Sequence, residues 1–212
     1  KAMKGGFSTI MRTQPLLPLF ALGFMIQFAI MSAQPLLPLF VQEVHPTTQY
    51  VAFYAGLVPA VTGMANMLAS PFLGRLGDRK GTQYVLFYSL LGATLFCIPQ
   101  AFVHSIGALL VTRFLLGLCI GGLLPSVNAL IRKFAPPGQE STTYGYCNSA
   151  LFMGNMLGPI LGGVLAGVIG IRGVFLLGAV LFAINTMWVK YVFEHRVDES
   201  RRLRLRKNLL PR

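Results

Sequence analysis

Six long stretches of this sequence contain no Asp, Glu, Lys or Arg, and they constrain the fold more than any other feature. They are residues 13–42, 44–74, 81–112, 114–131, 141–171 and 173–189. An α-helix needs about 20 mostly apolar residues to cross a hydrocarbon core of about 30 Å. A soluble helix would carry a charged face, whereas these stretches are apolar all round. The sequence therefore predicts an integral membrane protein made of α-helices.

The charge content supports this class and argues against a soluble domain and against a nucleic-acid-binding protein. Charged residues make up 11% of the chain, against about 25% in ordinary soluble domains. The net charge of +12 does not indicate nucleic-acid binding, because the basic residues lie between the apolar stretches and in the tail. Cys97, Cys119 and Cys147 form no CxxC pair, so neither a disulfide framework nor a metal site is expected. We expect no cofactor.

We predict an all-α membrane protein in which six transmembrane helices form one bundle. The predicted spans are residues 16–40, 51–73, 82–103, 106–131, 143–169 and 174–193. Residues 1–13 are expected to be a cytoplasmic N-terminal segment, residues 14–193 the bundle, and residues 194–212 a basic cytoplasmic tail. An apolar run that reaches about residue 40 is longer than the 7–15 residues of a signal-peptide core.

The distribution of Lys and Arg predicts the orientation of the bundle. The N-terminal segment, the loops at 74–81 and 132–142 and the tail carry nearly all basic residues, whereas the opposite loops carry only Arg172. Loops rich in Lys and Arg remain in the cytoplasm. Both termini are therefore expected to be cytoplasmic, with the bundle in the inner or plasma membrane.

The connection between the second and third spans has the most specific local pattern. Gly74, Asp78, Arg79 and Gly81 fall within a short charged turn, where Gly74 would let two helices approach and Gly81 would adopt a positive φ. Asp78 could accept hydrogen bonds from a helix N-terminus or a neighbouring Arg. This pattern resembles the signature loop of the major facilitator superfamily, G-x-x-x-D-R-x-G-R-K. The closing basic pair is absent, because Thr82 and Gln83 occupy those positions.

Two further patterns fall in the matching spans. Arg113 and Gly117 resemble the superfamily's fourth-span motif, R-x-x-x-G. Arg113 could instead extend to the membrane surface, since it lies near the outer end of its span. The fifth span resembles the antiporter motif, G-x-x-x-G-P-x-x-G-G, through Gly154, Gly158, Pro159, Gly162 and Gly163. The alternative is a plain packing seam, because small residues spaced by four let helices pack closely in lipid.

The resemblance extends from about residue 7 to residue 196. This stretch is similar to the second half, spans seven to twelve, of MdtG-like multidrug:proton antiporters of bacteria. A first half would also carry three such motifs, but the basic opening segment looks like the end of the family's central loop. The resemblance implies drug efflux by proton antiport, with hydrophobic or amphipathic drugs, membrane lipid and an N-terminal six-helix half as partners. It implies no enzymatic activity and no catalytic residue.

Substrate in such folds binds near the membrane midplane, between two bundles. Polar and aromatic residues at that depth are therefore candidate cavity residues, namely Gln27, Asn66, Asn128, Asn148, Asn155 and Phe152. Gln27 ranks first, because the family's first span of each half lines the cavity.

The predicted spans contain no Asp, Glu or His. Proton coupling needs a group that titrates within the pathway, so we expect the coupling acid to lie in the other half. The alternative function is that of a six-span membrane protein without transport activity, such as a truncated remnant or an assembly subunit.

Overall fold

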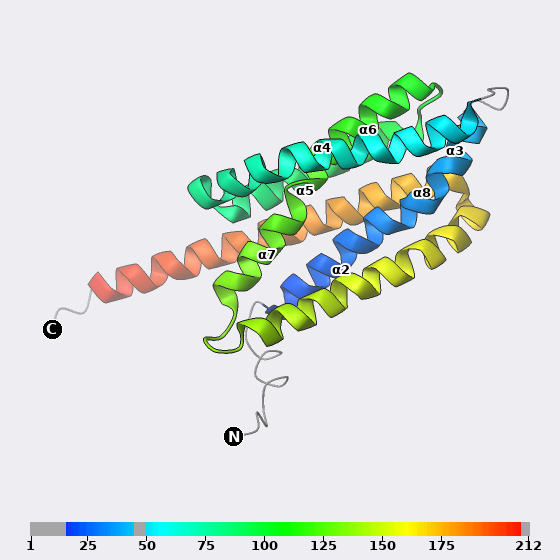
Figure 1. The fold of residues 1–212 in the computed structure, drawn as a ribbon. Helices are drawn as coiled ribbons and strands as arrows, with labels where there is room; N and C mark the ends of the chain where they lie inside the picture. The colour runs from blue at the N-terminus through cyan, green and yellow to red at the C-terminus, as the bar shows by residue number, and fades with distance from the viewer. Residues whose placement is uncertain (1–15, 45–49, 209–212) are drawn as a thin grey trace.

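The structure of the protein, a computed structural model, describes residues 16–44 and 50–208, and side chains only as far as residue 191. The predicted N-terminal segment 1–13 and the side chains of the basic tail lie outside these described residues. Every regular element in the described ranges is helical (Figure 1). The elements are α2 (Leu16–Ala33), the 3-10 turn η1 (Gln34–Leu36), α3 (Leu37–Val44), α4 (Val51–Lys80), α5 (Thr82–Ala101), α6 (Ile106–Ile120), α7 (Leu123–Phe134) and α8 (Glu140–Asn208).

Five helical segments are long and apolar enough to cross a membrane. They are Leu16–Val44, Val51–Lys80, Thr82–Ala101, Ile106–Phe134 and Glu140–Tyr191. The described part of the chain is thus an all-α membrane protein, as the sequence predicts.

Helix α8 contains both of the last two predicted spans. Its 69 residues include Gly170, whose backbone is not helical, with φ 75° and ψ 166°. Figure 1 shows α8 turning back on itself, from a yellow arm to an orange one. We call residues 140–169 the first arm and residues 171–208 the second arm. A positive φ with an extended ψ is accessible to glycine at little cost, which explains the sharp reversal without a longer loop.

Two of the predicted spans contain an internal break in the helix, and a third helix ends later than predicted. The predicted first span is interrupted by η1, where Pro35 lies at the start of the turn and cannot donate a backbone hydrogen bond. The predicted fourth span is divided into α6 and α7 at Gly121 and Gly122. Helix α4 runs past Pro59 and Pro71 to Lys80 instead of ending at residue 73, and it stops where Gly81 takes a positive φ.

Two clusters of buried apolar side chains form the core. The larger one joins α2, α5, α6, α7 and α8, with Leu86, Leu90 and Leu123 fully buried. The smaller one joins α3, α4, α5, α6 and α8 around Phe40 and Phe175. The rings of Phe40 and Phe175 meet edge to face, with centroids 5.1 Å apart.

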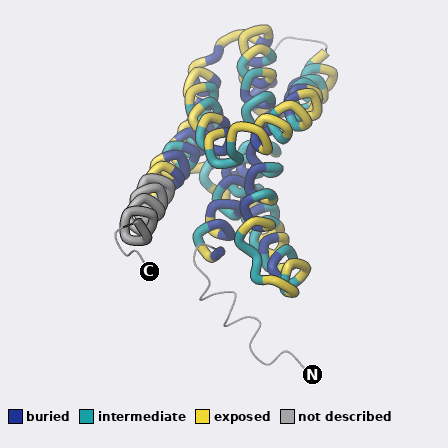
Figure 2. The backbone as a smooth tube through the Cα atoms, turned by 90° about the vertical axis from the view of Figure 1, so that its left-hand side faces the viewer, coloured by how far each residue is buried: buried dark blue, intermediate teal, exposed yellow. Residues whose placement is uncertain are grey.

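Figure 2 shows exposed residues along much of every helix, and many of the exposed residues are large and apolar. On α4, Met67 and Phe72 are each 72% exposed, and on the first arm of α8 Val168 is 78% exposed. Contiguous apolar surface of this kind marks contact with a membrane or another protein. The bundle is therefore suited to lie in lipid.

Candidate functional site

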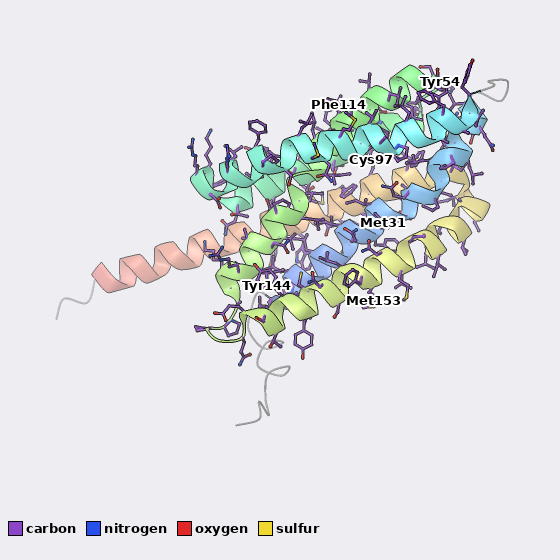
Figure 3. All side chains as sticks on the ribbon, in the orientation of Figure 1. Met31, Tyr54, Cys97, Phe114, Tyr144 and Met153 are labelled. Carbon is purple, nitrogen blue, oxygen red and sulfur yellow. The ribbon has the colours of Figure 1, made fainter. Side chains whose placement is uncertain are left out.

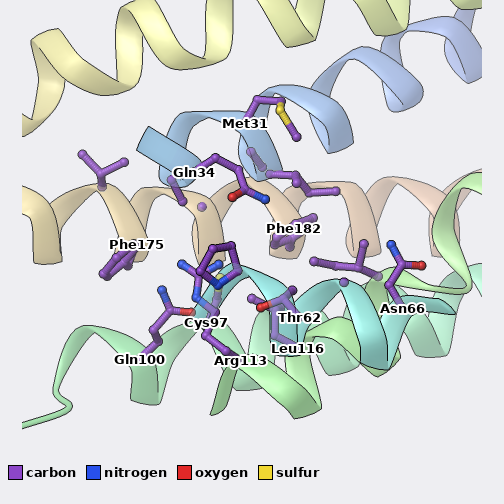
Figure 4. Close-up of a pocket in the computed structure, with 18 of the residues that line it drawn as sticks. Met31, Gln34, Thr62, Asn66, Cys97, Gln100, Arg113, Leu116, Phe175 and Phe182 are labelled. Carbon is purple, nitrogen blue, oxygen red and sulfur yellow. The ribbon is translucent and has the colours of Figure 1, made fainter. Parts of the chain in front are cut away.

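A cavity of about 180 Å³ lies inside the bundle between α2, α4, α5, α6 and the second arm of α8 (Figure 4). Its apolar walls include Leu116, Phe175 and Phe182. Five polar side chains also line it, namely Gln34, Thr62, Asn66, Gln100 and Arg113. Among the wall residues, Met31 and Gln34 are half-buried and Gly63 is exposed, so the cavity opens between α2 and α4.

The charged residue of this cavity is Arg113, which is 4% exposed. Its guanidinium lies 5.5 Å from the centroid of the Phe175 ring, and its Nε and Nη2 atoms have no hydrogen-bond partner. The interior position rules out the alternative that Arg113 extends to the membrane surface. Figure 4 shows it pointing from α6 into the cavity, together with Gln100 from α5.

No carboxylate among the described side chains compensates this buried charge. Glu43 pairs with Arg172 at 3.2 Å, and Asp78 and Glu140 are exposed at the ends of helices. A buried cation without a counter-ion is energetically unfavourable. A cavity lined by such a cation is therefore a candidate binding site for an anion.

Gln100 is a cavity residue that the sequence reasoning missed. It is fully buried, and neither its Nε2 nor its Oε1 has a hydrogen-bond partner. Gln100 lies within the predicted span 82–103 and within α5, which ends at Ala101, but it was not among the candidate cavity residues. A polar residue within an otherwise uncharged stretch was the available signal. Phe175 and Phe182 were also missed, and their seven-residue spacing does not distinguish them from ordinary core residues.

The predicted cavity residues divide into three groups. Asn66 lines the cavity. Gln27 and Asn155 meet across α2 and the first arm of α8, where Gln27 Nε2 donates to Asn155 Oδ1 at 2.5 Å. Asn128, Asn148 and Phe152 are exposed on the surface of the bundle and do not line this cavity.

The signature loop is shorter than expected. Gly81 has φ 107°, which confirms the predicted positive φ. It is the single residue between the end of α4 at Lys80 and the start of α5 at Thr82. The expected close approach at Gly74 is wrong within this chain, since nothing lies within 4 Å of a Cβ placed there. A Cβ placed on Gly77 would lie 3.5 Å from Thr82 Cα, which is an ordinary van der Waals contact. Asp78 and Arg79 are exposed, and none of the hydrogen bonds recorded for the described side chains involves Asp78.

Glycines of the fifth-span motif pack directly on α2, along what we call the α2–α8 seam. A Cβ at Gly154 would lie 2.8 Å from Phe24 O, and one at Gly158 would lie 2.8 Å from Met31 Cβ. A Cβ at Gly162 would meet the carbonyl oxygen of Ser32. Gly163 has open space around it and takes no part in this seam. Pro159 lies within α8, half-buried.

A second seam joins α4 and α6, and we call it the α4–α6 seam. A Cβ at Gly117 would meet the carbonyl oxygen of Thr62 and lie 2.8 Å from Ala65 Cβ. A Cβ at Gly121 would lie 2.9 Å from Asn66 O. The glycine of the fourth-span motif thus brings α4 against α6 beside the cavity, since Thr62 and Asn66 also line it.

Charged and aromatic residues meet where α3, the α5–α6 turn and the reversal of α8 come together. Arg172 Nε donates to Glu43 Oε1 at 3.2 Å, and Arg172 Nη1 lies 3.4 Å from His104 Nε2. The Arg172 guanidinium is 5.7 Å from the Phe40 ring centroid. At the opposite end of the first arm, Tyr144 OH donates to Asn128 O at 3.1 Å, beside α7 (Figure 3). These contacts join neighbouring helices at the two ends of the first arm of α8.

Comparison with known proteins places the chain in a family. The family model described as Major Facilitator Superfamily matches residues 7–211. An uncharacterized MFS-type transporter, YuxJ, of Bacillus subtilis (strain 168) is 42% identical over 142 residues, which cover 67% of this chain and 36% of that protein.

Two similar proteins have names that refer to drug resistance. The multidrug resistance protein MdtG of Erwinia billingiae is 34% identical over 92% of this chain and 47% of its own length. A multi-drug resistance efflux pump PmrA homolog of Lactococcus lactis is 32% identical over 82% of this chain and 43% of its own length. The chain therefore spans no more than about half the length of these curated relatives.

Proposed function

Because the chain belongs to the major facilitator superfamily, we propose that it forms the second six-helix half of a multidrug efflux transporter that works by proton antiport. The observation that carries the proposal is a membrane bundle with a partly polar internal cavity, in a chain similar to multidrug resistance proteins over 92% of its length. A multi-pass membrane protein with such a cavity is suited to moving small molecules rather than to catalysis.

The proposal requires six crossings of the membrane, two of which are made by α8. Each arm of α8 contains an uncharged stretch, residues 141–171 and 173–189, and Gly170 allows the chain to reverse between them. The α7–α8 turn at Gly138 and the tail then lie on the cytoplasmic side of the inner membrane, where the Lys and Arg residues are concentrated.

One face of the bundle is suited to line a transport path against the first half. On the first arm of α8, Asn148, Phe152 and Asn155 are spaced by four and three residues, so they project from one side of the helix. Gln27 joins this face through its hydrogen bond to Asn155, and Phe28 stacks on Phe24 beside it with ring centroids 6.0 Å apart. Aromatic walls with a few amides are typical of drug-binding pockets.

Proton coupling is assigned to the other half. Among the side chains described as far as residue 191, the carboxylates are Glu43, Asp78 and Glu140, which lie at helix ends and are not buried. A first half with an acid at mid-membrane depth would supply the missing titratable group.

Efflux of ethidium from bacteria that lack their own drug pumps tests the proposal. Cells that express the chain with a first half from an MdtG-type relative are expected to expel ethidium, and a protonophore is expected to stop them. The double variant Gln27→Leu, Asn155→Leu is expected to slow efflux about tenfold, because it removes a hydrogen-bonded pair from the path. Thr112→Val is the matched control, since that hydroxyl bonds only to carbonyls of its own helix.

Two results would separate the alternatives. Ethidium accumulation that is unchanged with every first half supplied would favour a six-span protein without transport activity. Efflux that persists under the protonophore would contradict antiport while leaving transport intact.

A further inference from the structure

We propose that the internal cavity binds a carboxylate carried on a small apolar or aromatic group, with Arg113 as its counter-ion. The inference goes beyond the proposed function, because it names a ligand class for the internal cavity and not for the ethidium path along α2 and the first arm of α8. The site is defined by three observations: a buried, unpaired guanidinium, a buried amide without partners beside it, and apolar walls.

The guanidinium supplies the charge recognition. Nε and Nη2 of Arg113 are adjacent donors in a planar fork, and both are buried without partners. Two such donors match the two oxygens of a carboxylate, which an Arg binds through paired hydrogen bonds. The Phe175 ring lies 5.5 Å from Arg113 Cζ and attracts the cation through its π-system. A ligand carboxylate would therefore meet the guanidinium beside an aromatic wall.

Gln100 supplies a second polar contact in the same cavity. Its amide is fully buried with both Nε2 and Oε1 unpartnered, so it has a donor and an acceptor available. A buried amide without hydrogen bonds is destabilising, and a ligand oxygen would satisfy its donor. Figure 4 shows Gln100 and Arg113 directed from neighbouring helices into the same space.

The remaining walls select the rest of the ligand. Leu116, Phe175 and Phe182 make the cavity largely apolar. A small inorganic anion such as chloride or phosphate would lose its hydration there without gaining apolar contacts, so its binding is disfavoured. The volume of about 180 Å³ is comparable with an engineered apolar cavity of about 150 Å³ that takes up benzene. A single-ring aromatic carboxylate therefore fits in size and charge, and benzoate is the simplest probe.

The test is calorimetric titration of the purified chain in nanodiscs of neutral phosphatidylcholine. Benzoate is expected to bind, and benzamide, which has the same ring without the charge, is expected to bind at least about tenfold more weakly. Arg113→Gln is expected to weaken benzoate binding by about 10- to 100-fold. Arg75→Gln is the matched control, because it removes one positive charge from an exposed site and should leave benzoate binding unchanged.

A second variant keeps the test decisive if Arg113→Gln does not fold. Gln100→Glu places a carboxylate within the cavity, where it is expected to pair with Arg113, raise the unfolding temperature and abolish benzoate binding. Gln100→Leu should weaken benzoate binding without raising the unfolding temperature. Unchanged benzoate affinity in Gln100→Glu would overturn the proposal.

Other outcomes also contradict the proposal. Equal affinity for benzoate and benzamide would show an apolar pocket only, and displacement of benzoate by equimolar chloride would show a small-anion site. Loss of benzoate binding when a first half is assembled with the chain would show that a carboxylate of that half is the counter-ion. Benzoate binding by the purified chain does not depend on efflux, so the site and the transport proposal can fail separately.

Discussion

Gly162→Val is expected to prevent stable folding of the bundle. A Cβ at this position meets the carbonyl oxygen of Ser32 and lies 2.8 Å from Ser32 Cα, and neither backbone atom can move without shifting α2. Overpacking a well-packed core destabilises by about 1–3 kcal/mol, and a collision with backbone falls at or above the top of that range. Close approach of helices through small residues is a principal source of stability in lipid. If α2 and α8 separate, few other interactions can compensate for the lost packing.

The measurement is the unfolding temperature of detergent-solubilised protein, with the yield of monodisperse protein after size exclusion. Gly163→Val is the matched control, because Gly163 is the next residue of the same helix and nothing lies within 4 Å of its added Cβ. Both variants carry the same helix propensity change. Equal losses of stability in the two variants would show that the seam does not hold α8 against α2.

Gly117→Val is expected to destabilise the other seam by a similar amount. Its Cβ would meet the carbonyl oxygen of Thr62 and lie 2.8 Å from Ala65 Cβ, so α4 and α6 must separate. Thr62 and Leu116 line the internal cavity, and the separation is therefore expected to deform the cavity as well.

Gly107→Val is the control for this second variant, since Gly107 lies in α6 with open space around it. The unfolding temperature should fall by several degrees or more for Gly117→Val and change little for Gly107→Val. A small change in both would mean that α4 and α6 can part without loss of the fold.

The uncharged stretches predicted the class of the fold because a helix that crosses the hydrocarbon core needs about 20 mostly apolar residues. They did not predict where helices break. Pro35 and the Gly121–Gly122 pair interrupt helices within apolar runs, and a hydropathy pattern carries no information about local backbone geometry. The reversal at Gly170 was placed within a predicted loop, but the chain needs one non-helical glycine there rather than a separate connecting segment.

The candidate site was only partly predictable for a related reason. Depth in the membrane can be counted along a span, and it drew attention to Gln27, Asn66 and Asn155, which the structure places on α2, α4 and α8. Which side of a helix faces a cavity depends on the packing of neighbouring helices. The burial of Arg113 and the unpartnered amide of Gln100 follow from that packing. A helix that is apolar on all sides has no polar face from which its orientation in the bundle could be predicted.

The central proposal is that α8 crosses the membrane twice, which would make the chain a six-helix bundle with both ends in the cytoplasm. Cysteine labelling with a membrane-impermeant maleimide tests it directly, in a background where Cys97, Cys119 and Cys147 are replaced. Ile169→Cys and Glu140→Cys are matched, because both residues are exposed, lie at the two ends of the first arm of α8 and leave the glycines with positive φ in place. The account predicts that intact cells label Ile169→Cys but not Glu140→Cys, and that inverted vesicles show the reverse. Labelling of both positions from the same side would contradict it.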